Sequence, residues 1–211
     1  MTLTETLKSV NSQNRTKIPA EVLAVMDEAT QQLIDKGLSS QVLKVGDTFP
    51  NFSLVNVHNK EMSLDLVSGS KATIISFYRG GWCPYCNIEL KALQGALAEF
   101  KSKGASLVAI TPETPDSSLT TSEKNELEFE VLSDINNDLA KQIGLVFQLP
   151  PALQSIYDKF GIDVAKHNKN ESFELPMPAT FVLNKNNEIV YSFVNEDYTK
   201  RADIEAILAA L

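Results

Sequence analysis

The distribution of apolar residues along the chain separates helical segments from segments typical of strands. Apolar positions recur every three or four residues over 19–38, which predicts a helix that Gly37 ends. The polar segment 1–18 shows no such period, and we expect it to be frayed. Further helices are expected at 86–103, at 117–127, at 133–144, after the proline pair 150–151 and at 200–211.

Short apolar runs between these helices predict strands. The run "ATIISFY" at 72–78 is apolar over almost its whole length, as expected for a strand buried on both faces of a parallel sheet. Residues 179–184 and 188–195 flank "KNN", a strong hairpin signal. Further strands are expected at 52–57, 61–66, 106–110 and 129–132.

The order of these elements predicts an α/β fold with a central mixed β-sheet flanked by helices. We expect an N-terminal helical extension over residues 1–40 and a single domain over 41–211. Reactive groups in such sheets tend to lie beyond the carboxyl ends of the parallel strands. The irregular segment 145–177 is long for a neutral connector, and such segments are usually functional.

Composition narrows the possible functions. The chain is 43% hydrophobic and 22% charged, which is ordinary for a globular protein. With 19 basic and 27 acidic residues its net charge is −8, which argues against binding to nucleic acid or to anionic membranes. The first 20 residues lack a signal-peptide pattern and no run of 18 apolar residues exists, so a cytoplasmic protein is expected.

The two cysteines of the chain, Cys83 and Cys86, stand in "YRGGWCPYCN" directly after the buried run 72–78. The strand end is expected to expose the sulfur of Cys83, and the helix N-terminus to favour its thiolate. Pro84 suits the first helical position, where its missing N–H has no partner. About one helical turn separates the two sulfurs, so we expect Cys83 to attack and the less exposed Cys86 to resolve the product.

Two other interpretations of the cysteine pair remain. A structural zinc site needs four ligands, and the other candidates are His58 and His167 in distant turns, together with carboxylates. A pair of inert buried thiols would leave Gly80, Gly81 and Trp82 without an explanation. A cytosolic Cys-x-x-Cys at a strand-to-helix junction favours redox chemistry. No metal or other cofactor is expected.

Residues 44–211 resemble the alkyl hydroperoxide reductase and thiol-specific antioxidant (AhpC/TSA) family, the peroxiredoxin-like branch of the thioredoxin superfamily. The resemblance rests, in order, on "KVGDTFPNFSL", "ATIISFYRGGWCPYC", "VLSDINNDLAKQIGL" and "MPATFVLNKNNEIVYSFVNEDYT". The local motif is also similar to thioredoxin, in Trp82 before the first cysteine, and to glutaredoxin, in Cys-Pro-Tyr-Cys. The resemblance implies a thioredoxin-like fold.

The sequence departs from the family at positions that contact the peroxide. Peroxiredoxins carry a proline seven residues and a Thr or Ser three residues before the attacking cysteine, where this chain has Ser76 and Gly80. They also place an arginine two residues before a late Thr-Phe, where this chain has Pro178. Of three arginines, Arg79 is near Cys83 in sequence and is the candidate to assist it. Solvation of the strand end is the alternative role.

Pro178 also fits a different pattern. In thioredoxin-like oxidoreductases a cis-proline precedes the late strand and helps to dock an extended peptide, so the resemblance predicts a cis bond here. A trans proline at the strand entry is the alternative. Thioredoxins carry a buried acid where this chain has Phe77. Asp47, Glu89 or a water would then have to transfer the proton of Cys86.

The resemblance implies a thiol-dependent peroxidase, an oxidoreductase that reduces a hydroperoxide substrate and is recycled by a thioredoxin- or glutaredoxin-type reductant. A thiol–disulfide oxidoreductase without peroxidase activity is the first alternative, and a non-enzymatic redox sensor is the second. The helix at 19–38 is expected to pack on the domain or on a second subunit, which would give a homodimer. A free, solvated helix is the other possibility.

Overall fold

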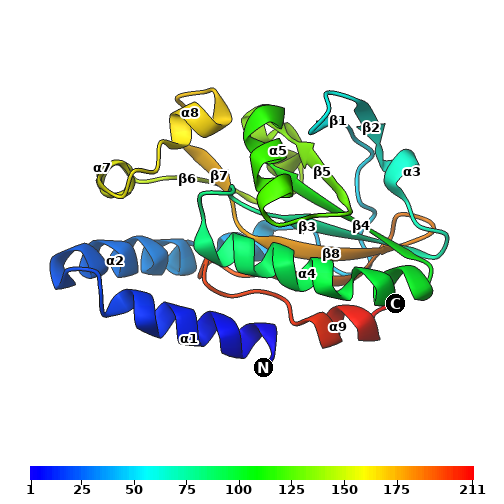
Figure 1. Cartoon of the computed structure of the whole chain (residues 1–211), viewed down its shortest axis with the longest axis horizontal. Coiled ribbons are helices and arrows are strands. Elements are labelled where there is room, and N and C mark those ends of the chain that lie inside the picture. Colours follow the sequence, from blue (N-terminus) through cyan, green and yellow to red (C-terminus); the bar gives the residue numbers. More distant parts are fainter.

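A mixed seven-stranded sheet with helices on both faces forms the centre of the protein (Figure 1). The computed structural model describes residues 1–211. The strand order is β2-β1-β5-β4-β3-β8-β9. The strands are β1 (Ser53–Asn56), β2 (Glu61–Ser63), β3 (Ala72–Phe77), β4 (Ala105–Thr111), β5 (Glu130–Ser133), β8 (Ala179–Asn184) and β9 (Ile189–Val194).

The three central strands β5, β4 and β3 run parallel, and antiparallel strands complete the sheet on either side. The α/β class and the mixed sheet predicted from the sequence are therefore confirmed. All residues of β3 are buried, as its continuous apolar run predicted. The carboxyl ends of the parallel strands lie at one edge, and the chain continues from β3 into the cysteine motif there.

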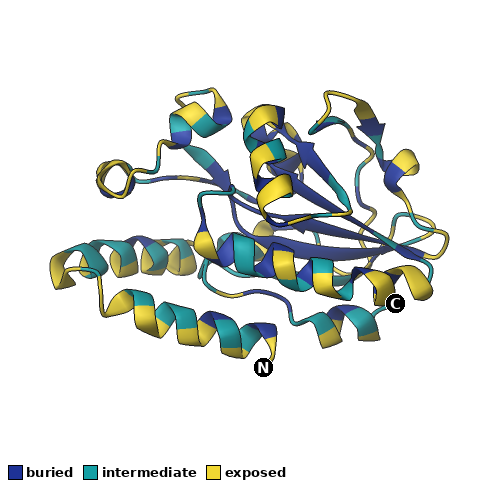
Figure 2. Ribbon diagram, in the orientation of Figure 1, coloured by how far each residue is buried: buried dark blue, intermediate teal, exposed yellow.

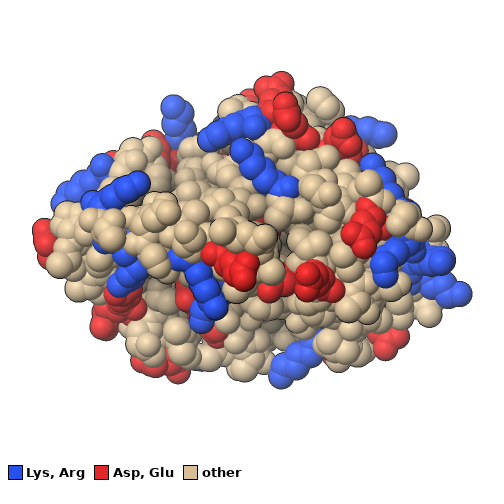
Figure 3. Space-filling model, turned by 60° about the horizontal axis from the view of Figure 1, so that its bottom comes forward, with Lys and Arg blue, Asp and Glu red and all other residues tan.

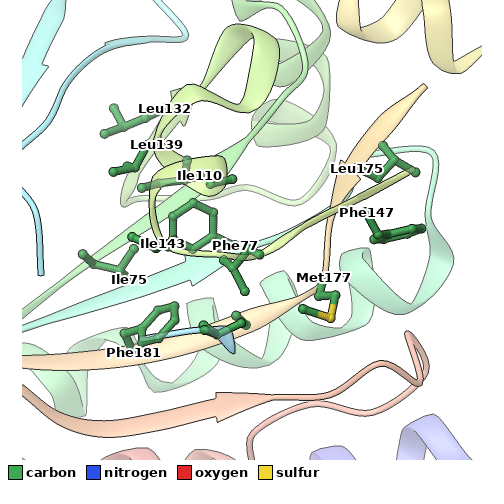
Figure 4. Packing of buried hydrophobic residues seen from close by; sticks show 14 of the residues in the cluster. Ile75, Phe77, Ile110, Leu132, Leu139, Ile143, Phe147, Leu175, Met177 and Phe181 are labelled. Atoms are coloured by element: carbon green, nitrogen blue, oxygen red, sulfur yellow. The ribbon is translucent and has the colours of Figure 1, made fainter. Parts of the chain in front are cut away.

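The residues of β3 alternate between two cores. Ile74 packs with α4 (Pro84–Ser102) and α9 (Ile204–Ala209) on one face. Ile75 and Phe77 face the opposite core, which includes Leu139 and Ile143 (Figure 4). Burial of each such side chain stabilises the fold by roughly 1.5–3 kcal/mol. In Figure 2 the central strands β3, β4 and β8 are therefore almost wholly buried, while the outer surfaces of the helices are exposed.

Remaining helices are short or cover the rim of the sheet. They are η1 (Leu38–Gln41), α3 (Leu64–Val67), α5 (Pro115–Lys124), η2 (Ile135–Asn137) and α6 (Asp138–Gln142).

Two elements differ from the sequence prediction: the strand expected at 61–66 and the helix expected at 133–144. The predicted strand at 61–66 ends at Ser63, because the Ser63 hydroxyl caps α3 by accepting the N–H of Leu66. Asn136 and Asn137 have left-handed backbones, so the helix predicted from 133 is interrupted before α6.

The segment 145–177 is ordered and forms an excursion from the sheet. Its strands β6 (Val146–Gln148) and β7 (Glu174–Pro176) pair with each other and frame α7 (Pro151–Lys159) and α8 (Val164–Asn168). Leu153 and Ile156 anchor α7 to the main core.

Residues 1–40, here called the N-terminal arm, contain two helices. The expectation that residues 1–18 are frayed is wrong. Residues Leu3–Arg15 form α1, which starts with a capping box between Thr2 and Glu5. Leu3 and Leu7 are four residues apart and form a short apolar stripe, which is buried where α1 packs on α4. Because the rest of the helix is polar, two leucines alone gave no recognisable helical period. Helix α2 (Ala20–Lys36) packs on α7, and Gly37 ends it in the left-handed conformation, as predicted.

The surface carries no extended patch of one sign on the face shown in Figure 3, where basic and acidic side chains are interspersed. None of the helices combines the length and the apolar character that crossing a bilayer requires.

Candidate active site

The cysteine motif joins β3 to α4. Cys83 is the N-cap residue of α4, Pro84 is its first residue and Cys86 lies in its first turn. The predicted strand-to-helix junction is therefore present, with the helix starting slightly earlier than the periodicity indicated. Both cysteines are free thiols.

Close packing explains the two glycines before the motif. A Cβ atom at Gly80 would lie 2.2 Å from Nε1 of Trp82, and one at Gly81 would lie 1.8 Å from Oγ1 of Thr121. The indole of Trp82 thus fills the space beside Gly80, where the family pattern has Thr or Ser. The carboxylate of Glu113 holds this loop by accepting the N–H of Gly81 at 2.8 Å.

Both sulfurs are covered, and the expected exposure of Cys83 at the sheet edge is wrong. Cys83 and Cys86 each have a relative exposure of 0%. Part of their surroundings comes from α1, a helix that the sequence did not predict, whose Leu3 and Leu7 belong to the same apolar cluster as the two cysteines. The hydroxyl of Tyr85 further ties the motif to α1, since it donates to Asn11 at 3.0 Å.

Arg79 is buried beside Cys83, with only 4% of its surface exposed. Its Nη2 lies 3.9 Å from the Cys83 sulfur, and its Nε has no hydrogen-bond partner. No carboxylate forms an ion pair with it. Its guanidinium lies instead among aromatic rings, 4.5 Å from the ring centre of Tyr198, 5.0 Å from Trp82 and 5.8 Å from Tyr157. Solvation of the strand end is therefore not its role.

Arg201 is a site residue that sequence reasoning missed. Its Nη2 donates to the Cys86 sulfur at 3.2 Å, its Nε pairs with the carboxylate of Glu89, and its Nη1 donates to the carbonyl oxygens of Tyr198 and Lys200. Glu89 and Arg201 are both buried. The signals available in the sequence were that Arg201 is one of three arginines and that Glu89 lies one turn after Cys86 in a helix.

These contacts shift the pKa values of the two thiols in opposite directions. Burial acts to raise the pKa of Cys83, but the hydrogen bond from Cys86 and the charges of Arg79 and Arg201 outweigh it, so this pKa lies well below the usual thiol value. Burial raises the pKa of Cys86 well above that value, and the neighbouring Cys83 adds to the rise. The site therefore favours a thiolate at Cys83 beside a neutral thiol at Cys86.

The cis bond predicted at Pro178 is wrong, because the structure contains no cis peptide bond. Pro178 stands where the chain leaves β7, whose partner is β6, and enters β8 in the central sheet, and an extended trans chain makes this connection. Pro178 is buried and shares a small cavity of about 20 Å³ with Arg79 and with Met26 of α2. Arg79 thus brings a guanidinium to the vicinity of the position where the family pattern has its arginine.

The two carboxylates considered for transfer of the Cys86 proton, those of Asp47 and Glu89, lie in different environments. Asp47 is exposed, and its carboxylate accepts the N–H of Lys44. Glu89 is buried next to the Arg201–Cys86 contact, and burial raises its pKa although Arg201 acts in the opposite direction.

The histidine considered as a zinc ligand, His167, lies 2.7 Å from Glu113. No group of three or more potential metal ligands forms.

The model of the AhpC/TSA family matches residues 45–192. The chain is 34% identical over 103 residues to a putative peroxiredoxin bcp of Buchnera aphidicola, covering 49% of this chain and 65% of that protein. It is 31% identical over 121 residues to the chloroplastic peroxiredoxin Q of Populus jackii, covering 56% of each. The chain thus spans less than two thirds of the length of these curated relatives.

Solved structures of similar fold support the architecture. The peroxidoxin BcpB of Mycobacterium tuberculosis matches with a TM-score of 0.62 and 19% identity, covering 80% of this chain and 96% of that one. The bacterioferritin comigratory protein of Xanthomonas campestris matches with a TM-score of 0.57 and 18% identity, covering 81% and 96%. These likenesses confirm the thioredoxin-like fold.

Proposed function

The chain belongs to the AhpC/TSA family, and from that premise we propose that it is a thiol-dependent peroxidase. Cys83 reduces the hydroperoxide and Cys86 resolves the oxidised product. The observation that carries this proposal is the buried guanidinium of Arg79, which has no carboxylate partner and lies beside the cysteine whose pKa is lowered. A charge in that position stabilises both the thiolate and the negative charge that develops as the O–O bond breaks.

In the first step the Cys83 thiolate attacks one oxygen of the hydroperoxide. An S–O bond forms as the O–O bond breaks, Cys83 becomes a sulfenic acid, and the leaving oxygen takes up a proton to give an alcohol or water. Arg79 performs the task for which the family pattern provides an arginine at the position of Pro178.

In the second step the Cys86 sulfur attacks the sulfenic acid. The S–S bond forms, the hydroxyl leaves with the Cys86 proton as water, and a Cys83–Cys86 disulfide results. Burial and the neighbouring Cys83 raise the pKa of Cys86, and the contribution of the Cys83 charge disappears when Cys83 is oxidised. The charge of Arg201, which donates to the Cys86 sulfur, acts in the opposite direction. Oxidation of the first sulfur therefore activates the second, with Glu89 keeping Arg201 in place.

A dithiol of the thioredoxin or glutaredoxin type returns the disulfide to the reduced state by supplying two electrons and two protons. The proposed compartment is the cytoplasm, where such reductants maintain cysteines as thiols. A homodimer remains a prediction.

A thiol–disulfide oxidoreductase would use the same two cysteines, and the Cys-Pro-Tyr-Cys motif favours it. Against it stands the burial of Pro178, which residues of α2 and α7 enclose in the cavity shared with Arg79. An extended peptide has no open groove at that position. The peroxidase is therefore the better supported function.

Two assays run in parallel test the proposed function. We expect the reduced protein to consume hydroperoxide in an NADPH-coupled thioredoxin system and to leave insulin disulfides intact. Cys83→Ser is the control that removes the attacking thiolate. Insulin reduction without peroxide consumption would identify the oxidoreductase instead. The absence of both activities, together with a redox-dependent change in protease sensitivity, would identify the sensor.

Cys86→Ser separates the two chemical steps. This variant is expected to complete one oxidation of Cys83 and then to accumulate the sulfenic acid, because no second thiol can displace its hydroxyl. Dimedone labelling followed by mass spectrometry measures the product. Multiple turnover at the wild-type rate in this variant would show that Cys86 does not resolve the intermediate.

A further inference from the structure

A buried carboxylate at the carboxyl edge of the sheet has no part in the two chemical steps proposed above. Glu113 follows the end of β4 at Thr111, and its relative exposure is 0%. Burying a carboxylate is costly unless partners satisfy its oxygens. One oxygen of Glu113 accepts the N–H of Gly81, and the other lies 2.7 Å from Nδ1 of His167. The carboxylate therefore joins the loop before Cys83 to α8 of the excursion 145–177.

Gly81 is held at both of its backbone polar groups. Its N–H donates to Glu113 at 2.8 Å, and its carbonyl oxygen accepts from the side-chain amide of Asn87 at 2.7 Å. Asn87 is fixed in turn, because its side-chain oxygen accepts from Nδ2 of Asn125 at 2.7 Å. These contacts come from the end of β4, from α4 and from the end of α5. The elements around the loop thus determine where its backbone lies.

The position of Gly81 determines that of Trp82, the next residue. The indole N–H of Trp82 is buried and has no hydrogen-bond partner, so the side chain makes no polar contact that would hold it in place. Its ring lies 5.0 Å from the guanidinium carbon of Arg79, whose Nη2 lies 3.9 Å from the Cys83 sulfur. A displacement of the Gly81 backbone would therefore move one of the rings that hold the guanidinium beside the sulfur.

His167 restrains the second oxygen of Glu113. Neither this oxygen nor Nδ1 of His167 has another polar partner, so the contact of 2.7 Å is the one that each of them makes. The backbone reinforces the contact, because the N–H of Thr114 donates to the carbonyl oxygen of His167 at 3.0 Å. Two contacts thus connect α8 to the residues that follow β4.

Neither Glu113 nor His167 reaches the space next to the sulfur. A cavity of about 270 Å³, here called the cavity over Cys83, is lined by Cys83, Arg79 and Trp82 among other residues. Glu113 and His167 do not line it. Any effect that they have on the reaction must therefore pass through the loop, as expected of residues that support an active site without contacting the substrate.

We propose that Glu113 is a positioning residue for the cysteine motif and that His167 orients it. Through Gly81, Glu113 fixes the indole of Trp82. The indole in turn keeps the guanidinium of Arg79 beside the reactive sulfur. Because His167 belongs to α8, the excursion 145–177 takes part in setting the reactivity of the thiolate. The effect on turnover rests on the peroxidase function proposed above, whereas the effect on the thiolate does not depend on it.

Three variants test this role, with Asp134→Leu as the control. Glu113→Gln keeps an oxygen that can accept the N–H of Gly81 and an amide that can donate to His167, whereas Glu113→Leu keeps neither. His167→Phe removes only the second contact. Asp134 is also a buried carboxylate, directly after β5, and it accepts two backbone N–H groups of α6. Its replacement removes comparable hydrogen bonds without touching the cysteine motif.

The first readout is the rate at which hydroperoxide oxidises Cys83, measured by stopped flow. Glu113→Leu should react about tenfold to a hundredfold more slowly than the wild type, the scale expected when a reacting group is displaced by about 1 Å. Glu113→Gln should restore most of the rate, and Asp134→Leu should keep it. His167→Phe should lie between the two Glu113 variants. It tests the proposal even if Glu113→Leu does not fold, because it leaves the Gly81 bond in place.

Two further readouts do not depend on turnover. Iodoacetamide alkylation of Cys83 at neutral pH should slow in the same order of variants, because a displaced guanidinium stabilises the thiolate less. The emission of Trp82, the one tryptophan of the chain, reports directly on the residue that the loop positions. It should shift to longer wavelength in Glu113→Leu and stay unchanged in Glu113→Gln and Asp134→Leu.

Equal losses of rate in Glu113→Leu and Asp134→Leu would show a merely structural role and would overturn the proposal. A Glu113→Gln variant as slow as Glu113→Leu, or an unchanged Trp82 emission in Glu113→Leu, would also overturn it. Wild-type rates in His167→Phe would overturn the part assigned to the excursion. If the wild type consumed no peroxide, the proposed function would fail, and the alkylation rates and the emission would still decide the role of Glu113.

Discussion

Replacing Arg79 by methionine is expected to slow the oxidation of Cys83 by hydroperoxide by about a hundredfold to a thousandfold, the usual effect of removing one preorganised donor from an active site. The guanidinium lies beside the sulfur and has no carboxylate that would neutralise it. Methionine keeps a similar length and apolar contact with the surrounding rings. Since the change removes a buried charge rather than creating one, the variant is expected to fold.

The pH dependence of the Arg79→Met variant distinguishes an electrostatic role from a structural one. The pKa of Cys83 is lowered in the folded protein, so its thiolate persists as the pH falls until the pH passes that lowered pKa. Without Arg79 the pKa rises, and reactivity should begin to fall at a higher pH. The loss relative to the wild type should therefore grow as the pH falls below the raised pKa of the variant and shrink at alkaline pH, where Cys83 is ionised in both proteins.

Two measurements check this result: stopped-flow oxidation by peroxide, and the rate of iodoacetamide alkylation as a function of pH. Lys60→Met is the control, because it removes an exposed positive charge that does not line the cavity over Cys83. An unchanged pH profile in Arg79→Met would contradict the assignment, as would a loss of rate that is equal at every pH.

The parts of this site that the sequence predicted are those determined by local chain geometry. A continuous apolar run, two glycines and a proline before an amphipathic stripe define the junction of β3 and α4, and hence the place of Cys83. Arg79 could be identified for the same reason, since it lies four residues before the cysteine. Its conformation could not be identified, because that depends on Tyr157 and Tyr198, which are remote in sequence.

The parts that escaped prediction depend on tertiary contacts. Arg201 lies 115 residues after Cys86 and reaches it only because the chain returns from β9 towards α4. Helix α1 was missed because two buried leucines in a polar segment give a weak periodic signal, although they belong to the same apolar cluster as the two cysteines. Pro178 was assigned from a motif, and the motif does not reveal that α2 would lie over it. In each case the sequence does not show which distant element packs on the motif.

Replacing Glu89 by leucine is expected to lower the free energy of unfolding of the reduced protein by about 3–5 kcal/mol, because Arg201 is left as a buried charge without its carboxylate. The carbonyl oxygens of Tyr198 and Lys200 compensate part of the loss, which places the expectation towards the lower end of that range. Urea unfolding followed by circular dichroism measures the change. Glu99→Leu on the exposed side of the same helix is the control, and it should change stability by no more than about 0.5 kcal/mol.

The double variant Glu89→Leu/Arg201→Met tests whether the loss of stability in Glu89→Leu comes from the unpaired charge of Arg201. Removing both charges leaves no uncompensated group, so the double variant should be more stable than Glu89→Leu alone, although it carries one more substitution. It should nevertheless form the Cys83–Cys86 disulfide more slowly than the wild type, because Arg201 contacts the Cys86 sulfur. Restored stability with slow disulfide formation separates the electrostatic role of Arg201 in resolution from its role in folding. A double variant that is no more stable than Glu89→Leu, or that resolves the sulfenic acid at the wild-type rate, would contradict this role for the pair.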